Sequence, residues 1–513
     1  MRVLVVARQV VFPAALATAL TVALAAVVAA ALAVALAAAL AGECAAFPLV
    51  GAGDIRFRLD HASFRSGVGT TESEFYLEVD NVDLGFRVKD GRLVANAEFH
   101  LEFHGGGKHL GGREYPLEFG EGAPAGSDGA VPPEVAARRQ VVQLRIPLPA
   151  GTDSVAAEIQ DRNARKRGIV YLFTKTPKSG FAAAPLVLRR FPEGEISVSD
   201  IEFARPFGGH AVDPTFVKSG LDVEPNPGRV YGAPDRIAAT YLEAYDLHPW
   251  QAGERRQYEL TYVLRDQDGT ELRTWQRKLS SQVETWADTT SFDVSTLPAG
   301  TYALGVIVKE AAGGGRALVE SSFDVVWASA SWTRWLAETE SVVPFLLDGI
   351  ELDNFLALRP GAKERYLDQF WASRDPTPGQ GNEIREEFNR RIAFANYNYT
   401  TTLEPGMRTD RGRIYIKYGE PDEVQREVIP VQGNDINEAL EELDRSTAGD
   451  LTGSRTIDPE DSRSFEIWIY DYRGQELFPK KQMSTSLGLQ FVFVDDLGVG
   501  DFRLIRASDQ SDY

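Results

Sequence analysis

Short runs of alternating apolar and polar residues occupy residues 50–330 and predict β-strands, in which successive side chains point to opposite faces. Two dipeptides, Asp90-Gly91 and Asp268-Gly269, each separate a pair of such runs. Both favour the tight turn of a β-hairpin, because Asp and Gly adopt a positive φ at low cost. Many short strands divided by turns are typical of β-sandwiches, so we expect an all-β region here.

A repeated pentapeptide divides this β region into two parts. Leu148–Thr152 has the same sequence, LPAGT, as Leu297–Thr301, and a strand pattern precedes and follows each copy. We therefore expect two tandem immunoglobulin-like sandwiches, at residues 50–195 and 196–330, with the two copies in equivalent turns. Tyr302, directly after the second copy, occupies the place where such sandwiches have a tyrosine corner.

The pattern changes to the helical period after residue 330. One apolar helical face that ends before Pro376 is formed by Tyr366, Leu367, Phe370 and Trp371. Asn382 is the expected N-cap of a second helix. Strand patterns then return at residues 414–418, 465–470, 489–494 and 502–505. We therefore expect an α+β domain over residues 331–513, with an acidic surface loop at residues 431–464.

The N-terminal segment is an export signal. Residues 10–41 are almost entirely Ala, Val and Leu, and two arginines precede them. Such a segment acts as a cleaved signal peptide or as an uncleaved membrane anchor helix within residues 1–45. The positive charges stay inside, which predicts an extracytoplasmic body in the periplasm or cell envelope. The single cysteine, Cys44, leaves lipidation as a third alternative, although Glu43 displaces it from a lipobox position, and no internal disulfide can form.

The composition excludes some partners and some chemistry. A formal net charge of −20 opposes binding to nucleic acid and to anionic lipid surfaces, which bind proteins through clustered Lys and Arg. Residues 331–513 contain no His and no Cys. Nucleophile–base pairs built on imidazole or thiolate are therefore excluded from the C-terminal domain.

The segment Pro405–Asp422 has the sequence PGMRTDRGRIYIKYGEPD. It resembles the signature of the GWxTD domain family, which consists of bacterial envelope proteins with no established biochemical activity. Met407 stands at the position of the signature Trp. The other residues that carry the resemblance are Gly406, Thr409, Asp410, Gly412, Arg413, Tyr418, Gly419, Pro421 and Asp422. We expect a polar turn completed by Gly412, then a strand over Ile414–Tyr418, then a second tight turn.

One polar face in the first β region has the residue types of a metal site. Glu98, His100, Glu102 and His104 alternate with apolar residues, which fits a strand and excludes an HExxH helix. Such a face could ligate zinc, with His109 as a further ligand. The pattern favours an ordinary solvated strand face, so no metal and no cofactor are predicted. The acidic stretches Asp266–Glu271 and Asp495–Gly498 are likewise interpreted as turns, in preference to calcium loops.

Carboxylates are the remaining candidates for chemistry in the C-terminal domain. A pair drawn from Asp375, Asp410, Asp422 and Glu466 could serve glycoside hydrolysis. The surroundings of Asp410 favour a structural turn residue, whose replacement by Ala would cost about 0.5–2 kcal/mol by analogy with helix caps.

The sequence favours a non-enzymatic structural or interaction module of the bacterial cell envelope over an enzyme. The expected partner is an envelope protein or glycan, with membrane contact through the N-terminal segment if that segment is uncleaved. The alternative is a carboxylate-dependent hydrolase of envelope polysaccharide, which would need two carboxylates at one pocket, whereas a binding module should expose an aromatic or apolar patch.

Overall fold

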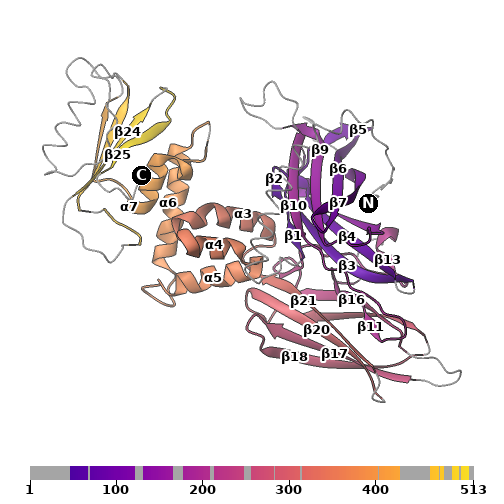
Figure 1. Ribbon diagram of the computed structural model, residues 1–513. Coiled ribbons are helices and arrows are strands. Elements are labelled where there is room, and N and C mark those ends of the chain that lie inside the picture. The colour runs from indigo at the N-terminus through magenta and orange to yellow at the C-terminus, as the bar shows by residue number, and fades with distance from the viewer. Residues whose placement is uncertain are drawn as a thin grey trace. The chain divides into compact units, whose positions relative to one another are not determined.

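The structure of the protein is a computed structural model. It describes residues 47–67, 70–121, 131–165, 177–207, 213–247, 256–281, 283–311, 315–402, 404–427, 463–472, 474–478, 488–495 and 498–507. The N-terminal apolar segment, Cys44 and most of the acidic stretch 431–464 lie outside the described residues. The described chain is mostly β-sheet, with its longer α-helices towards the C-terminus (Figure 1). Among the described helices, none has the length and apolar character needed to cross a membrane.

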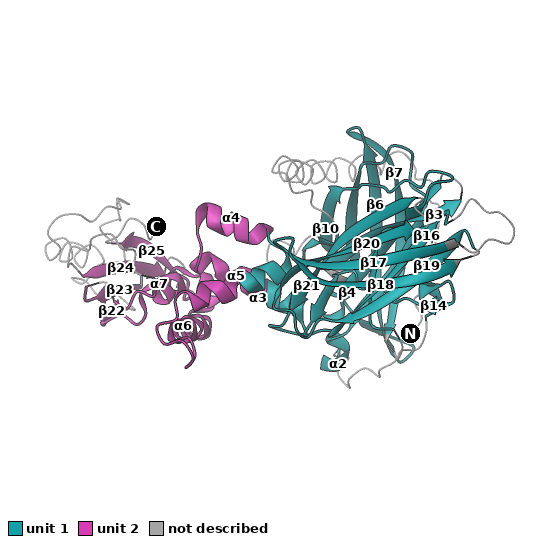
Figure 2. Cartoon of the chain, turned by 90° about the horizontal axis from the view of Figure 1, so that it is seen from below, with its two compact units in different colours: residues 1–336, 358–365 teal, residues 337–357, 366–513 magenta. Residues whose placement is uncertain are grey.

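The chain forms two compact units (Figure 2). Unit 1 comprises residues 1–336 and 358–365, and unit 2 comprises residues 337–357 and 366–513. Two of the three limits between the units fall inside continuous helices, α3 (Trp332–Val342) and α5 (Pro360–Ala372).

The N-terminal half of unit 1 contains two antiparallel sheets. The sheet with the order β1-β3-β4-β8 consists of Leu49–Val50, Phe57–Gly67, Thr70–Asp80 and Arg139–Ile146. The sheet with the order β2-β10-β9-β6-β5, in which β7 also pairs with β6, consists of Ala52–Gly53, Pro177–Pro185, Ser154–Arg165, Arg92–Gly105, Arg87–Lys89 and Lys108–Glu121. Helices η1 (Asn81–Asp83) and α2 (Pro133–Ala136) lie between strands. Residues of both sheets share one buried core, which makes this half a β-sandwich.

The C-terminal half of unit 1 repeats this plan with a core of its own. One sheet has the order β11-β16-β12, with β19 also on β16, and consists of Ser197–Val198, Ile237–Tyr245, Glu202–Ala204 and Thr285–Asp293. The other has the order β15-β21-β20-β17-β18 and consists of Val230–Gly232, Arg316–Val326, Gly300–Glu310, Arg256–Asp266 and Glu271–Ser281. After helix η3 (Pro214–Phe216), strands β13 (Val217–Lys218) and β14 (Leu221–Asp222) form a small two-stranded ribbon.

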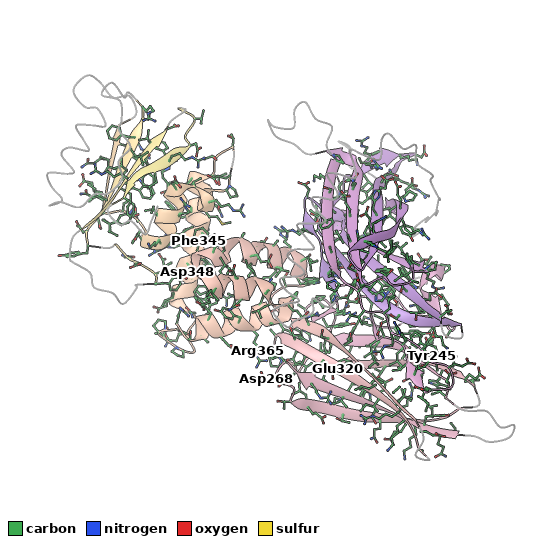
Figure 3. All side chains as sticks on the ribbon, in the orientation of Figure 1. Tyr245, Asp268, Glu320, Phe345, Asp348 and Arg365 are labelled. Atoms are coloured by element: carbon green, nitrogen blue, oxygen red, sulfur yellow. The ribbon has the colours of Figure 1, made fainter. Side chains whose placement is uncertain are left out.

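Both predicted hairpins are confirmed. Asp90 and Gly91, with φ values of 51° and 75°, turn the chain from β5 into β6. Asp268, labelled in Figure 3, lies in the turn between β17 and β18. The carboxylate of Asp266 accepts hydrogen bonds from the amides of Asp268 and Thr270, at 3.0 and 2.9 Å. This acidic stretch is a hydrogen-bonded turn, as the sequence indicated.

The two LPAGT copies connect strands in corresponding places. The first leads from β8, which pairs with β4, to β9, which lies between β10 and β6. The second leads from β19, which pairs with β16, to β20, which lies between β21 and β17. Each copy therefore carries the chain from one sheet of a sandwich to the other. The local backbone differs, because Gly151 has a φ of 83° whereas Gly300 already pairs with Val325 in β20.

The tyrosine after the second copy forms the expected corner. The hydroxyl of Tyr302 donates a hydrogen bond of 2.8 Å to the carbonyl oxygen of Pro298, four residues upstream. A hydroxyl bonded back to the preceding backbone is what a tyrosine corner requires.

A buried lysine joins the two sandwiches within unit 1. Lys218 forms ion pairs with Glu74 of β4 and Glu202 of β12, and its side chain is only 5% exposed. Its ammonium donates a hydrogen bond of 3.1 Å to the hydroxyl of Tyr76 and lies 4.5 Å from the ring centroid of Phe64. The ammonium therefore pairs with two buried carboxylates and makes a cation–π contact at the same time.

Burial and this crowding raise the pKa of Glu202. Desolvation is the largest influence, and the nearby Glu74 carboxylate adds to it, while Lys218 opposes both; the result is a pKa of about 7, against an ordinary 4.5. Burial of Glu78 has a different outcome. Desolvation alone would raise its pKa, but Arg58 and two further arginines outweigh it and lower the pKa to about 2.

Unit 2 consists of helices followed by an antiparallel sheet. After α3 come η4 (Val343–Phe345), α4 (Gly349–Ala357), α5, α6 (Glu383–Tyr399), η5 (Gly406–Arg408) and α7 (Asp410–Tyr418). The sheet has the order β22-β23-β24-β25 and consists of Glu423–Glu427, Phe465–Tyr470, Leu489–Asp495 and Phe502–Ala507. Asn382 caps α6 as predicted, because its side chain accepts a hydrogen bond of 2.9 Å from the amide of Arg385.

The predicted strand over Ile414–Tyr418 is wrong, because these residues form helix α7. A short apolar run does not by itself distinguish the two structures. The ends decide: Thr409 caps the first turn through its hydroxyl, and Gly419, with a φ of 83°, closes the last turn by donating to the carbonyl of Tyr415 at 2.8 Å. The first strand of the sheet is instead β22, which the sequence analysis missed.

Candidate functional site

The motif 405–422 forms the corner between α6 and α7. The amide of Gly406 donates to the hydroxyl of Thr400 at 2.9 Å. The hydroxyl of Thr409 donates to the carbonyl of Gly406 at 2.7 Å and accepts from the amide of Gly412 at 3.1 Å. A Cβ atom on Gly406 would lie 1.9 Å from the carbonyl oxygen of Ala395. The backbone segments of this corner are therefore in direct contact.

Gly412 is a contact residue inside a helix. The predicted chain reversal at this position is wrong: Gly412 lies in the first turn of α7 and does not have a positive φ. A Cβ atom here would lie 1.8 Å from the carbonyl oxygen of Gly406. Close approach, and not a turn, therefore explains the glycine.

We expect Gly412→Ala to lower the free energy of unfolding of unit 2 by about 1–3 kcal/mol, because a backbone oxygen cannot move aside as a side chain can. An ordinary helical Gly→Ala change would stabilise by up to about 1 kcal/mol. Urea denaturation measures the sign. Stabilisation by Gly412→Ala would contradict the close approach.

Met407 belongs to the buried side of the corner. Its side chain is 7% exposed, and its amide donates a hydrogen bond of 2.9 Å to the side chain of Asn396 in α6. The position of the signature Trp is thus a packing position, which an apolar Met also fills.

Asp410 links the corner to the sheet. One carboxylate oxygen accepts a hydrogen bond of 2.7 Å from the amide of Leu504 in β25, and the other pairs with Arg413 one helical turn later. The predicted structural role is therefore supported, but the predicted turn is wrong: Asp410 is the first residue of α7, and its backbone partner lies 94 residues away.

Replacing Asp410 by Ala is expected to cost about 1–3 kcal/mol, because the amide of Leu504 is left without an acceptor. Asp410→Asn should cost less than about 1 kcal/mol, since the amide oxygen can still accept and the lost ion partner, Arg413, is half exposed. Thermal melting distinguishes the two variants. Equal losses for Ala and Asn would show that the charge, and not the hydrogen bond, matters.

The second half of the motif anchors the end of α7. Tyr418 is fully buried and packs on Tyr470 and Phe491, with ring centroids 5.7 and 5.4 Å away. The carbonyl of Gly419 accepts a hydrogen bond of 2.9 Å from the hydroxyl of Tyr470. Asp422 accepts from the amide of residue 471, and the half-buried Pro421 precedes it.

A buried arginine that the sequence analysis missed holds the same end of α7. Arg391 of α6 is 1% exposed and donates to the carbonyls of Ile416 and Lys417, both at 3.2 Å, and to the carbonyl of Gln475 at 2.7 Å. Its Nε pairs with Glu387 one turn earlier, at 2.7 Å. The last carbonyls of a helix lack intrahelical partners, so this guanidinium acts as a C-terminal cap.

A second buried arginine lies between α7 and the sheet. Arg411 forms an ion pair of 3.2 Å with Glu466 and lies 4.1 Å from the ring centroid of Phe502. Glu466, 1% exposed, also pairs with Arg426 at 2.5 Å and accepts from the indole of Trp468 at 3.2 Å. The carboxylate is therefore fully occupied by donors.

The four carboxylates considered for hydrolysis each have a local partner. Asp375 accepts from the amide of Thr377 at 2.9 Å, in the turn after α5. The contacts of Asp410, Asp422 and Glu466 are those described above. Among the described residues, Asp375, Asp410 and Asp422 accept from backbone amides and Glu466 accepts from side chains, and none of these hydrogen bonds joins two carboxylates.

The aromatic residues upstream of the motif form a separate cluster. Trp371 packs on Phe370, Phe388 and Phe478, with ring centroids 5.1 to 6.3 Å away. The guanidinium of Arg374 lies 3.6 Å from the ring centroid of Phe370. The predicted helical face is confirmed as a packing face.

The histidine-containing face of unit 1 is a strand face, as predicted. Phe99, Leu101 and Phe103 of β6 are at most 1% exposed, and the polar residues between them point the other way. The ligand set proposed for zinc is divided in two. His104 contacts His109, with ring centroids 5.4 Å apart. His100 instead lies directly opposite Glu114 of β7 in the strand register.

The second acidic turn, at Asp495, is also hydrogen-bonded. Its carboxylate accepts from the amides of Val499 and Gly500, at 3.2 and 2.7 Å. These contacts favour the turn interpretation over a calcium loop, and Asp496 and Leu497 of this stretch lie outside the described residues.

Comparison with known families gives one match, to the GWxTD domain, at residues 344–429. No curated protein matches the sequence. Similar solved structures include a calcium-binding mutant of Bacteroides uniformis beta-glucuronidase 2 (11% identity, TM-score 0.18, covering 52% of this chain and 28% of that chain). Another is a glycosyl hydrolase family 2 member from Bacteroides cellulosilyticus DSM 14838 (7% identity, TM-score 0.16, covering 50% and 28%). The match thus spans under a third of those chains, and no function is transferred from them.

Proposed function

We propose that this chain, which contains a GWxTD domain at residues 344–429, is a non-enzymatic structural or interaction module of the bacterial cell envelope. In this proposal, two immunoglobulin-like sandwiches, at residues 50–195 and 196–330, act as spacers or binding surfaces. The domain at residues 331–513 carries the motif corner.

The observation that supports a non-enzymatic role is the use of the motif's polar groups. The side chains of Thr409, Asp410 and Asp422 form hydrogen bonds with backbone groups. Glycoside hydrolysis needs two carboxylates about 5–10 Å apart on either side of a substrate. Carboxylates already committed to holding backbone elements are poor candidates for acid–base work.

An exposed aromatic pair beside the corner supports an interaction role. Phe394 and Tyr397 lie one turn apart on α6 and are 36% and 88% exposed, although one face of Phe394 stacks on Tyr415 of α7, with ring centroids 4.3 Å apart. The same helix supplies Asn396 and Arg391, which hold η5 and α7. A rigid helix that presents exposed aromatic side chains suits recognition of a partner, because aromatic residues dominate binding energy at interfaces.

The envelope location in this proposal depends on the N-terminal segment. Residues 10–41 would direct export and leave everything after them outside the cytoplasm. A reporter fused after Tyr513 should be active only in the extracytoplasmic compartment. Activity of a cytoplasmic reporter at the same position would overturn the location.

The interaction role is tested by a photo-crosslinking amino acid at position 397 of the full chain in cells. We expect a specific crosslinked product that is absent when the same probe replaces Ile350, which is 79% exposed in the same unit.

Purified chain should release no reducing ends from isolated envelope polysaccharide. Release that Asp410→Asn abolishes without loss of folding would establish the hydrolase instead.

A further inference from the structure

The outer face of the β7–β6–β9 sheet gathers carboxylates around one imidazole. His100 lies on the central strand, β6, directly opposite Glu114 of β7 and Glu158 of β9. Glu98 precedes it by two residues and therefore points to the same face. Directly opposed residues of neighbouring strands have Cβ atoms only about 4.5–5.5 Å apart, so these four side chains are within reach of one another.

The distances in this cluster suit a single metal ion. Nε2 of His100 lies 3.6 Å from Oε2 of Glu98. One ligand atom each from Glu98, His100 and Glu114 lies within 4.8 Å of the others. Two ligand atoms on a tetrahedral zinc ion, at bond lengths of about 2.0–2.2 Å, are separated by about 3.3–3.6 Å. Small rotations of the side chains would therefore bring all three atoms to bonding distance.

The imidazole is poised to bind a ligand. Nε2 of His100 is shielded from solvent and has no hydrogen-bond partner among the described residues, although the side chain as a whole is 28% exposed. Oε2 of Glu98 forms an ion pair with Arg162 of β9 and, when the imidazole is protonated, with His100. One guanidinium does not balance three neighbouring carboxylates, and a divalent cation would supply the missing charge.

We propose that Glu98, His100 and Glu114 form a binding site for a divalent transition-metal ion of the zinc type. A mixed imidazole and carboxylate set is suited to zinc and related ions, whereas magnesium and calcium prefer oxygen ligands alone. Three protein ligands on an open sheet face leave the remaining position to water. The site lies in unit 1 and is independent of the function proposed for the motif corner.

The pair His104 and His109 is the alternative zinc site on the same hairpin. Its rings are in contact, and burial together with His109 lowers the pKa of His104, which leaves it neutral over a wider pH range. Its partners are different residues, so substitutions can separate the two sites.

The test is titration of Zn²⁺ into the full chain carrying Cys44→Ser, which removes the one thiol. We expect one bound ion per chain by equilibrium dialysis, and a rise in melting temperature on adding Zn²⁺. His100→Gln and Glu114→Gln should each weaken binding by at least about 10–100-fold, since removing even a supporting residue of a metal site has that effect. The metal-free melting temperature should not change, because both side chains point away from the core.

Two controls decide the assignment. Glu118→Gln removes a carboxylate from β7 that pairs with the exposed Lys89, and it should leave zinc affinity unchanged. His104→Gln should also leave it unchanged. Absence of zinc binding, or a loss caused by His104→Gln and not by His100→Gln, would overturn the proposal.

Discussion

Lys218→Met is expected to lower the free energy of unfolding of unit 1 by about 3–5 kcal/mol. The ammonium pairs with the buried carboxylate of Glu202, and Oε1 of that carboxylate already has no hydrogen-bond partner among the described residues. Glu74 would keep Arg145 and Gln143, both at 2.9 Å. Glu202 is therefore the charge that the substitution leaves buried and uncompensated.

The loss of stability caused by Lys218→Met should depend on pH. This dependence distinguishes the loss of an ion pair from the loss of packing contacts. The pKa of Glu202, about 7, lies above its ordinary 4.5. Between pH 4.5 and 7, Glu202 is therefore protonated in the folded chain and ionised in the unfolded chain. Its contribution to the free energy of unfolding is complete below pH 4.5 and is lost as the pH rises through 7. Removing Lys218 raises the pKa further. The variant should consequently lose most stability near pH 8 and least near pH 4.5.

Urea denaturation at the two pH values measures this difference. Lys89→Met is the matched control, because its ion pair with Glu118 is exposed and should contribute less than about 1 kcal/mol. Adding Glu202→Gln to Lys218→Met should recover part of the loss at pH 8. A deficit of the same size at both pH values would refute the electrostatic explanation.

Arg391→Met is expected to destabilise unit 2 by about 3–5 kcal/mol, since it leaves the backbone carbonyls of Ile416, Lys417 and Gln475 without this donor. The loss should be local to the end of α7. Amide hydrogen exchange of residues 410–419 should accelerate, because the helix can then open from its C-terminal end.

The neighbouring arginine supplies the control for this experiment. Arg390 pairs with the same carboxylate, Glu387, but its side chain is 55% exposed. Arg390→Met makes the same change of charge and should cost no more than about 0.5 kcal/mol. If the two variants lose equal stability, the capping role of Arg391 is wrong.

The features that could be predicted from the sequence are those set by residues close together in the chain. The turn at Asp90-Gly91, the N-cap Asn382 and the corner at Tyr302 each depend on residues a few positions apart, and each is confirmed. The histidine strand was also recognisable, because three apolar residues alternate with polar ones over β6.

The error at Ile414–Tyr418 had a local remedy. Thr409 and Gly419 flank the segment as a helix cap and a helix stop, and these two signals outweigh a five-residue apolar run. The polar residues before the segment and the alternation within it favoured a turn followed by a strand, and that interpretation concealed the cap.

The buried charges could not be predicted from one sequence. Arg391 and Lys218 look like ordinary surface residues, because Arg and Lys are almost never fully buried without a partner. Their partners lie far along the chain, at Gln475 and Glu74 for example, and become neighbours only after folding. The pairing of His100 with Glu114 is equally inaccessible, since it depends on the register of β6 and β7.

The division of the chain into units has a practical consequence for fragment work. The segment 358–365 belongs to unit 1, although both of its flanks belong to unit 2. Within it, Arg359 pairs with Asp324, and Glu364 accepts the amide of Trp327 at 3.0 Å. A fragment that begins at residue 331 would therefore carry this segment away from its partners.

The same division of the chain predicts the outcome of limited proteolysis. Proteases cut segments that can leave the fold locally, and two of the three passages between the units lie inside helices. A cut in the third passage, at residues 357–358, would leave 337–357 folded into one unit and 358–365 into the other. The two fragments should remain associated until denaturant is added, so the expected digestion pattern is two shorter bands on a denaturing gel with no change in native size.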